Sequence, residues 1–193
     1  MTGRSATAAA TRRRVLDAAS GLMRERLRSD IRVQDVAMGA AVSEMTVLRL
    51  FGTKAALLKA AMEHARQGIV AQRSEAEPGD VAGSIAVLFD HYEELGDLVI
   101  RNLAEEGSDP AIGQIVRAGR DDHRQWIERQ FGPRLGDLAH PDRSVVINGL
   151  IAACDVYVWK LLRRDLGLNL TEALKTVQQL VEGLIDAHPP NPL

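Results

Sequence analysis

The stretch from Val33 to Leu58 constrains the fold of this chain more than any other part of its sequence. Val33, Val36 and Ala37 recur at helical spacing, which predicts a short helix over 33–38. The next four residues, Gly-Ala-Ala-Val at 39–42, are small enough to break that helix and to let two helices pack closely. We therefore expect a short helix that ends in a tight turn.

A second short helix is expected directly after the turn, over 43–51. Ser43 is a good N-cap for it, because its side-chain oxygen can accept a hydrogen bond from an N–H group of the first turn. Thr53 can likewise cap a further helix that begins at Lys54. Two short helices around a small-residue turn form a helix-turn-helix unit, whose second helix enters the major groove of DNA. The buried face of that second helix is expected to hold Val47, Leu50 and Phe51.

These residues resemble the amino-terminal DNA-binding domain of the TetR family of transcriptional regulators. The family pattern there is roughly T-V-x-D-I-A-x-x-A-G-V-S-x-G-T-L-Y-x-H-F-x-S-K-E-A-L, and the segment 11–27 is similar to the family's first helix. The resemblance covers about the first third of the chain, and it implies a three-helix DNA-binding domain followed by a helical ligand-binding and dimerisation domain. The chain matches the pattern at Val33, Asp35, Ala37, Ala40, Val42, Ser43, Thr46, Phe51, Lys54, Ala56 and Leu57.

Four positions depart from the family pattern. Ala41 stands where the family usually has a glycine in the turn, so the turn has to form without a positive φ or under strain. Met45 replaces a glycine. Leu48 and Leu50 replace a tyrosine and a histidine with phosphate-binding roles, so two polar contacts with the DNA backbone are missing. These leucines keep a second interpretation open, in which the helix-turn-helix no longer binds DNA and the chain is a helical interaction protein.

The candidate DNA contacts lie in and beside the second helix of the unit, the recognition helix. Arg49 can donate to a guanine edge or to a phosphate, and Glu44 can accept from a cytosine. Thr53 and Lys54 stand at a helix N-terminus, where backbone N–H groups and a cation hold phosphate together. The family resemblance carries a phosphate-binding role over to Lys54. The full candidate set is Arg32, Gln34, Ser43, Glu44, Met45, Thr46, Leu48, Arg49, Thr53 and Lys54.

Charge divides unevenly along the chain, although the whole carries a formal net charge of −2. Residues 1–60 contain 11 Lys and Arg against 5 Asp and Glu, a net charge of +6, whereas residues 61–193 have a net charge of −8. A basic end that carries a helix-turn-helix has the electrostatic character of a DNA-binding domain, and the acidic remainder is repelled by phosphate. A basic end alone is also compatible with an ordinary solvated surface.

Composition favours helices throughout. Hydrophobic residues make up 46% of the chain, enough for a sizeable core, but aromatic residues only 4%, and strands rely on aromatic and β-branched residues. The single Cys154 excludes an internal disulfide and suits a reducing compartment. No secretory leader is visible, and polar residues interrupt the apolar run at 145–162. We therefore expect a cytoplasmic protein without a membrane span.

The expected fold is all-α with two domains. A helix-turn-helix DNA-binding domain over 1–54 is joined by a helix at 54–71 to an effector-binding and dimerisation domain over 72–193. Residues 1–10 are small and polar, and we expect disorder there before a first helix at 11–26. Asp109 is expected to cap a helix with Pro110 at its first position. The helices of the second domain are expected at 81–92, 95–105, 110–131, 141–164 and 171–187.

The last two expected helices are apolar over more than one face, so each must be buried on several sides. The family resemblance implies that two such helices from each of two chains form a four-helix interface, and that the homodimer binds a palindromic site. The alternative is an ordinary monomer core. The candidate interface residues are Val146, Leu150, Cys154, Val158, Leu161, Leu174, Val177, Leu180, Val181 and Leu184.

The resemblance also implies a small-molecule effector in a pocket among the middle helices. The low aromatic content excludes an extensive aromatic cage and favours an apolar or amphipathic effector, although Arg101 and Arg120 leave an acid open. Each candidate lining residue can instead be a core or dimer contact. The candidates are Phe89, Tyr92, Asn102, His123, Trp126, Ile127, Asn148, Tyr157 and Trp159.

An enzyme is the main alternative from another class. The run Asp121-Asp122-His123 resembles an acid/base cluster, but neighbouring residues on a helix point in different directions. The five histidines are scattered, which argues against a zinc site, and there is no Walker loop, dinucleotide fingerprint or nucleophile elbow. We therefore expect no enzyme, no metal and no cofactor, but a bacterial transcriptional regulator, a repressor, whose partners are double-stranded DNA, a second copy and an effector.

Overall fold

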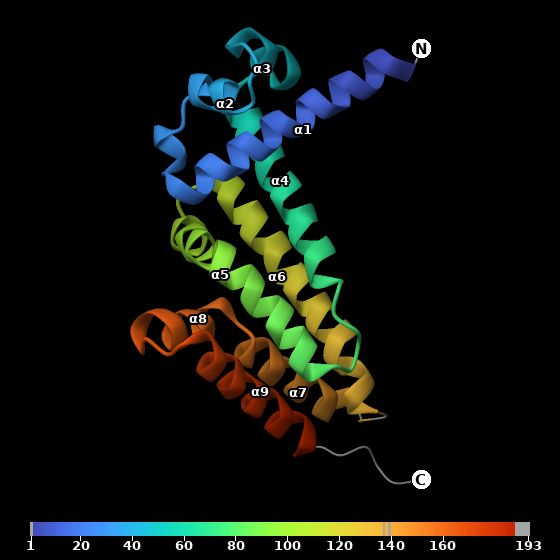
Figure 1. Ribbon diagram of the computed structural model, residues 1–193. Coiled ribbons are helices and arrows are strands. Elements are labelled where there is room, and N and C mark those ends of the chain that lie inside the picture. The colour runs from blue at the N-terminus through green and yellow to red at the C-terminus, as the bar shows by residue number, and fades with distance from the viewer. Residues whose placement is uncertain (1, 137, 139, 188–193) are drawn as a thin grey trace. The chain divides into compact units, whose positions relative to one another are not determined.

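The computed structural model describes residues 2–136, 138 and 140–187, and every regular element in those ranges is a helix (Figure 1). The expected all-α fold is thus confirmed. Contacts divide the chain into two compact units, 1–68 and 69–193, and the division falls inside helix α4 (Lys54–Arg73). Sequence patterns placed a linking helix at 54–71, so the helix that joins the units extends two residues further.

The first unit consists of α1 (Thr2–Glu25), a short 3-10 turn η1 (Arg28–Asp30), α2 (Val33–Gly39), α3 (Glu44–Phe51) and the first part of α4. α1 packs against α2, and α2 against α3. The buried Ser20 hydroxyl of α1 donates to the Ala61 carbonyl of α4 at 3.1 Å. The core of this unit is formed by Val15, Leu16, Ala19, Met23, Ile31, Val36, Ala37, Ala40, Val47, Leu57, Leu58, Ala61 and Met62.

The prediction of disorder before residue 11 is wrong for the residues that the structure describes. α1 begins at Thr2, nine residues earlier than expected. The segment holds Ala6 and the run 8–10, all alanine, and alanine has the strongest intrinsic helix propensity. A weakly apolar segment can therefore continue a helix that is nucleated further along the chain; Met1 lies outside the described residues.

The second unit begins with two long helices, α5 (Val81–Glu105) and α6 (Pro110–Phe131), followed by a 3-10 turn η2 (Gly132–Leu135). The sequence predicted a break in α5 near 93–94, but these two residues are glutamates, good helix formers, and the helix continues through them. The expected cap of α6 is confirmed, because the Asp109 side chain accepts from the N–H of Ala111 at 2.8 Å with Pro110 in the first turn.

The single helix expected at 141–164 is three pieces: α7 (His140–Ala153), α8 (Val156–Lys160) and a π-helical turn η3 (Leu161–Asp165). The break has a local cause, because the Asp155 side chain accepts from the N–H of Tyr157 at 2.9 Å and starts a new helix. In η3 the N–H of Leu166 donates to the carbonyl of Leu161, five residues back, at 2.8 Å. The last helix, α9 (Leu170–Asp186), is capped by Asn169.

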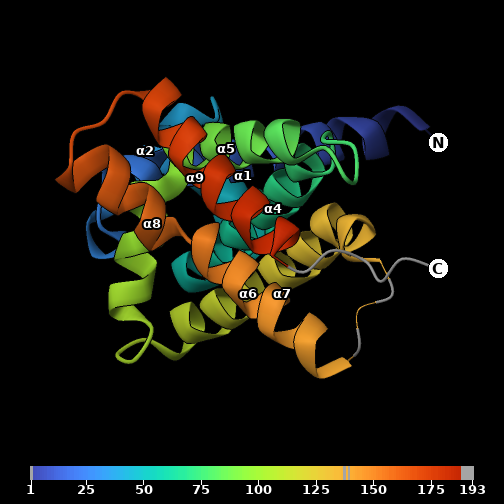
Figure 2. The same ribbon diagram turned by 90° about the horizontal axis from the view of Figure 1, so that it is seen from below.

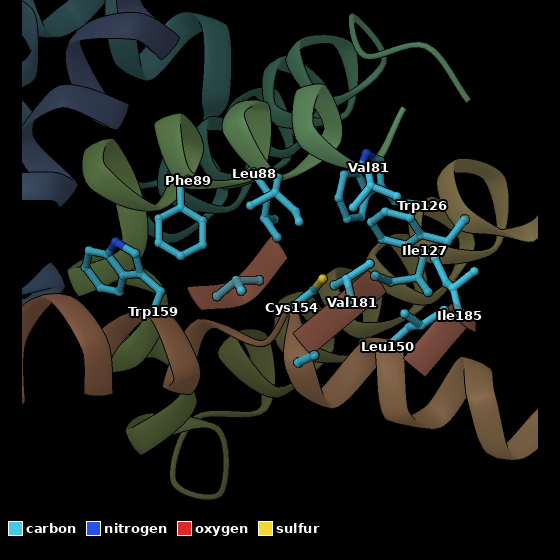
Figure 3. Close-up of a cluster of buried hydrophobic side chains, with 14 of the residues drawn as sticks. Val81, Leu88, Phe89, Trp126, Ile127, Leu150, Cys154, Trp159, Val181 and Ile185 are labelled. Carbon is cyan, nitrogen blue, oxygen red and sulfur yellow. The ribbon is translucent and has the colours of Figure 1, made fainter. Parts of the chain in front are cut away.

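α5 is the central helix of the second unit, since it packs against α6, α8 and α9, while α7 packs against α6 and α9 (Figure 2). The side chains of these helices meet in one continuous core (Figure 3). Its largest fully buried members come from different helices, which ties the unit together. They are Trp159, Phe89, Phe131, Ile85, Leu88, Ile127, Leu135 and Leu150.

The apolar stretch Asp142–Asp165 is long and hydrophobic enough, by length and composition, to cross a membrane. In the structure it is not one straight helix, because it breaks at Cys154 and Asp155. Of its most apolar window, 44% is buried inside the chain. Packing against α5, α6 and α9 accounts for much of its hydrophobicity.

Gly96 of α5 packs closely against the ring of Trp159 of α8. A Cβ atom on Gly96 would lie 2.4 Å from the Trp159 ring. The indole is held in place, because its Nε1–H donates to Glu93 at 2.8 Å and the Arg164 guanidinium stacks on it at 4.4 Å from the ring centre. Glycine is therefore required at 96 by steric contact.

We predict that Gly96→Ala destabilises the protein by about 1–3 kcal/mol, because the added methyl overpacks a rigid aromatic contact. The matched control is Gly119→Ala on the exposed side of α6, where a Cβ meets nothing within 4 Å. There the higher helix propensity of alanine should raise stability slightly. Urea unfolding of both variants measures the difference, and equal effects would show that the ring moves aside freely.

Candidate nucleic-acid interface

The turn between α2 and α3 is closed by backbone hydrogen bonds. The N–H of Ala41 donates to the carbonyl of Met38 at 3.1 Å, and the N–H of Val42 to the carbonyl of Ala37 at 3.0 Å. Ala41 has φ 53°, the only non-glycine residue with positive φ in the part of the chain that the structure describes. The turn therefore keeps the conformation that glycine favours, with an alanine held in the left-handed region at a cost in strain.

α3 begins at the expected cap. The Ser43 hydroxyl oxygen accepts from the N–H of Thr46 at 3.2 Å, and the hydroxyls of Ser43 and Thr46 lie 3.0 Å apart. Ser43 is exposed and Thr46 is half-buried. Both side chains thus fix the first turn of α3 while keeping some surface in contact with solvent.

The outer face of α3 is open. Glu44, Met45, Leu48 and Arg49 are exposed, Met45 to 73% and Leu48 to 39%, whereas Val47 on the opposite face is 1% exposed. These four residues recur three and four apart, so they share one side of the helix. That side combines one anion, one cation and two flexible apolar side chains.

The other expected contacts lie at helix starts. Arg32 and Gln34 are exposed at the beginning of α2. The Thr53 hydroxyl accepts from the N–H of Ala56 at 3.1 Å, which confirms Thr53 as the cap of α4. The Lys54 ammonium donates to the carbonyl of Ser29 at 3.0 Å, which engages one of its three donors.

Two arginines of α1 form contacts with the helix-turn-helix. Arg12 donates to the carbonyl of Leu50 at 3.4 Å and stacks over the Phe51 ring at 4.4 Å, while Arg14 donates to the carbonyl of Ala40 at 3.3 Å. Neither arginine was predicted to contact the helix-turn-helix. No local pattern signals such a role, because the contacts span 26 to 38 residues.

The expected dimer residues divide into two sets. Five are buried in the chain's own core: Val146, Leu150, Cys154, Val177 and Val181. The other five keep accessible surface in this single chain: Val158, Leu161, Leu174, Leu180 and Leu184. Val145 and Tyr157 of the same helices are also exposed, at 66% and 54%.

The expected effector residues are not gathered around one space. Phe89, Ile127 and Trp159 are core side chains with 1% exposure or less, Asn148 and Tyr157 are exposed, and Asn102 is half-buried. Asn148 accepts from Arg124 at 2.9 Å.

One cavity of about 230 Å³ lies in the second unit between the end of α4 and α6, and Trp126 is the only expected effector residue that lines it. The residues around the cavity are Ile69, Val70, Arg73, Ser74, Asp122, Gln125, Trp126 and Arg129. Of these, only Trp126 was a candidate from the sequence, because an arginine near a helix end gives no sign that it is buried.

His123 and Tyr92 lie beside Arg73, which is 7% exposed. The Arg73 guanidinium is 3.4 Å from Nδ1 of His123, and its carbon lies 5.5 Å and 5.6 Å from the ring centres of Tyr92 and Trp126. Burial, with the Arg73 charge as second cause, lowers the pKa of His91 to about 3 and that of His123 to about 4. Both histidines are therefore neutral at pH 7.

The run 121–123 does not form an acid/base cluster, since Asp121 is exposed and His123 is buried. Within the described ranges, no group of three or more His, Cys, Asp or Glu side chains is arranged to hold a metal ion.

Comparison with known proteins identifies the fold. No family model and no curated protein matches the chain. A TetR transcription regulator from Haloarcula marismortui has a similar structure, with a TM-score of 0.65 at 18% identity over 93% of this chain and 98% of that chain. A TetR-family transcriptional regulator from Streptomyces coelicolor has a TM-score of 0.68 at 16% identity, over 90% of this chain and 78% of the other. The chain therefore has a TetR-like fold.

We predict that Ala41→Gly stabilises the first unit by about 1 kcal/mol or less, because it removes left-handed strain but adds chain entropy to the unfolded state. Ala40→Gly is the matched control. Ala40 has φ −87° and is 2% exposed, so glycine there loses packing without relieving strain and should destabilise. Opposite signs in urea unfolding support the assignment; a loss of stability in both variants would contradict it.

Proposed function

We propose that this chain is a transcriptional regulator that binds a palindromic DNA site as a homodimer and acts as a repressor controlled by a small molecule. The observation that carries the proposal is the solvent-exposed outer face of α3. This helix directly follows the strained turn at Ala41 and lies in the basic part of the chain. A regulator of this kind acts where the chromosome lies, which places it in the cytoplasm.

Base contacts are proposed for the outer face of α3. Arg49 is the best candidate for a guanine, since its exposed guanidinium can donate two parallel hydrogen bonds to one base edge. Glu44 suits a cytosine amino group, and Met45 and Leu48 suit thymine methyl groups. The exposure of Leu48, at 39%, is consistent with an apolar contact to DNA in place of a phosphate contact.

Phosphate contacts are proposed for the groups at the helix starts. Lys54 has two donors beyond its bond to Ser29, and Arg32 and Gln34 are exposed at the start of α2. Ser43, Thr46 and Thr53 contribute less, because their hydroxyls already form hydrogen bonds at the starts of α3 and α4. Such contacts set the orientation of a protein on DNA and make its affinity depend on salt.

Dimerisation is proposed through the apolar surface that α7, α8, η3 and α9 leave accessible, with Leu161 and Leu180 at 48% exposure each as its central residues. A two-fold interface is self-complementary, so one such surface is enough for two copies. A dimer on DNA places two recognition helices about 34–36 Å apart, one turn of the duplex, and this selects an inverted repeat.

Control by an effector is proposed as a population shift. α4 is unbroken from Lys54 to Arg73, and the cavity lies at its C-terminal end. A molecule that binds better to one arrangement of α4 would change the fraction of dimers whose recognition helices suit the operator.

Selection from a random pool of duplex DNA tests the proposal. We predict enrichment of an inverted repeat with half-sites about one helical turn apart. The enriched site should bind with a steep inverse dependence on salt. Failure to bind any duplex even at low salt would instead support a helical interaction protein.

We predict that Arg49→Ala weakens binding to the selected site by about 1–3 kcal/mol and relaxes preference at one base pair. Lys54→Ala should weaken binding to all sequences and reduce the salt slope by about one. Arg134→Ala, an exposed arginine of η2 in the second unit, is the control for loss of one positive charge. If Arg49→Ala behaves like this control, its role in base recognition is wrong.

We predict that Leu161→Arg and Leu180→Arg each convert the dimer to monomers in analytical ultracentrifugation, because a charge at the centre of an apolar interface cannot be solvated. Leu27→Arg, which changes a leucine of similar exposure, 52%, in the first unit, is the control. A monomeric wild-type chain, or dimers that persist in both variants, would place the interface elsewhere.

A further inference from the structure

We propose that the cavity beside Arg73 binds the carboxylate of a small organic monoacid. As the identity of the effector, this rests on the proposed function; as a binding site, it can be tested without DNA.

The first step is the charge of Arg73. A guanidinium stays protonated in proteins, so this buried side chain carries a permanent positive charge. A buried charge is ordinarily compensated by an opposite charge. Among the residues that the structure describes, no carboxylate forms an ion pair with Arg73, and its buried Nε has no hydrogen-bond partner. The charge thus lacks its usual complement.

The neighbours of Arg73 do not replace that complement. Its side-chain hydrogen bond to Nδ1 of His123 is long, at 3.4 Å, and Tyr92, its other side-chain partner, is a neutral phenol because burial raises its pKa. The rings of Tyr92 and Trp126 attract the cation through their faces, which compensates only part of the cost of burial. His91 is buried with Nδ1 unpartnered and, like His123, has a lowered pKa, so neither histidine supplies charge.

Asp155, a carboxylate whose charge acts on this cluster, is engaged elsewhere. Asp155 raises the pKa of Tyr92 as a minor cause beside burial. Its side chain, however, caps α8 by accepting from the N–H of Tyr157 at 2.9 Å.

A cavity lies beside this charge, and Arg73 is part of its lining. Its lining runs from Val70, Ser74 and Gln125, which are exposed, to Trp126 and Arg73, which are buried. A second cation, Arg129, lies in the same wall and donates to the Ser74 hydroxyl at 3.2 Å and to the Arg73 carbonyl at 3.2 Å. Two arginines, Arg73 and Arg129, therefore line one opening.

The size and walls of the cavity define the rest of the ligand. At about 230 Å³ it is smaller than sites for drug-sized molecules, which are about 300–1,000 Å³. Ile69, Val70 and Trp126 offer apolar contacts to a small hydrocarbon body. Asp122 in the lining repels a second negative charge, so a monoanion fits better than phosphate or a dicarboxylate.

Of the two arginines that the sequence suggested for an acid, Arg101 and Arg120, the second is already bound to a carboxylate. Arg120 donates to both carboxylate oxygens of Glu106, at 2.7 Å and 3.0 Å, and lies at the surface. Arg73 is therefore a better candidate than Arg120 for the arginine that binds an acid.

The test is calorimetry on the full chain with two matched pairs, benzoate against benzamide and hexanoate against hexanamide, and with inorganic phosphate as a separate arm. We expect at least one carboxylate to bind, and its amide to bind about tenfold more weakly or worse, since a charge-assisted hydrogen bond is lost. The bound acid should change tryptophan emission, and Trp126→Phe should remove that change because Trp126 lines the cavity.

Arg73→Met and Arg134→Met separate this site from a general effect of charge. Arg73→Met should abolish carboxylate binding and leave the melting temperature of the ligand-free protein equal or higher, because it removes an uncompensated buried charge. Arg134→Met should change neither. A purely structural Arg73 would instead give a lower melting temperature with carboxylate binding unchanged.

Several outcomes would overturn the proposal: no heat with either acid, amides that bind as well as acids, phosphate that binds more tightly than both acids, or binding that persists in Arg73→Met. If that variant does not fold, the wild-type comparison of acid with amide still decides. Repeating the DNA titration with the acid then tests its role as effector, so that loss of DNA binding and loss of acid binding are seen separately.

Discussion

The second unit depends on the burial of α5 from several sides at once. Its apolar side chains meet α6, α8 and α9, so one helix supplies the surface on which the others are ordered. Tight packing around a central helix leaves little freedom for side chains, and Gly96 marks where a neighbour has no room even for a methyl group. The position of the cavity follows from this order, because α6 presents Trp126 and Asp122 to the end of α4 only while α5 holds it in place.

Local chemistry made the first unit predictable. Ser43, Thr53 and the small turn residues determine where α3 and α4 begin, and the caps have the expected hydrogen bonds. The positive φ of Ala41 could be anticipated only as one of two alternatives, because the sequence does not reveal how much strain the surrounding contacts can hold. Arg14 contributes one of those contacts through its bond to the Ala40 carbonyl, which is distant in the chain.

The sequence predicted that the second unit is helical, but not where all of its helices begin and end. Sequence patterns located α6 and α9 closely: Asp109 caps α6 as expected, and α9, capped by Asn169, begins one residue before the predicted start at 171. Apolar periodicity predicted one helix in place of α7, α8 and η3. A single Asp155 inside an apolar run indicates a polar interruption of a helix and not the cap of a new one. Periodicity also cannot distinguish burial within one chain from burial against a second chain. Val146 and Leu161 were therefore both predicted to lie in the dimer interface, although they differ in exposure.

The π-helical turn η3 has a consequence for how the carboxyl-terminal helices are aligned. In a turn wider than an α-helix, consecutive residues are separated by a smaller angle, so two neighbours can face the same way. Arg163 and Arg164 do so: the first donates to Glu93 and the second to Asp97, acids one helical turn apart on α5. The two ion pairs together set the axial register of α8 along α5. A slide by one residue would separate both arginines from their acidic partners at the same time.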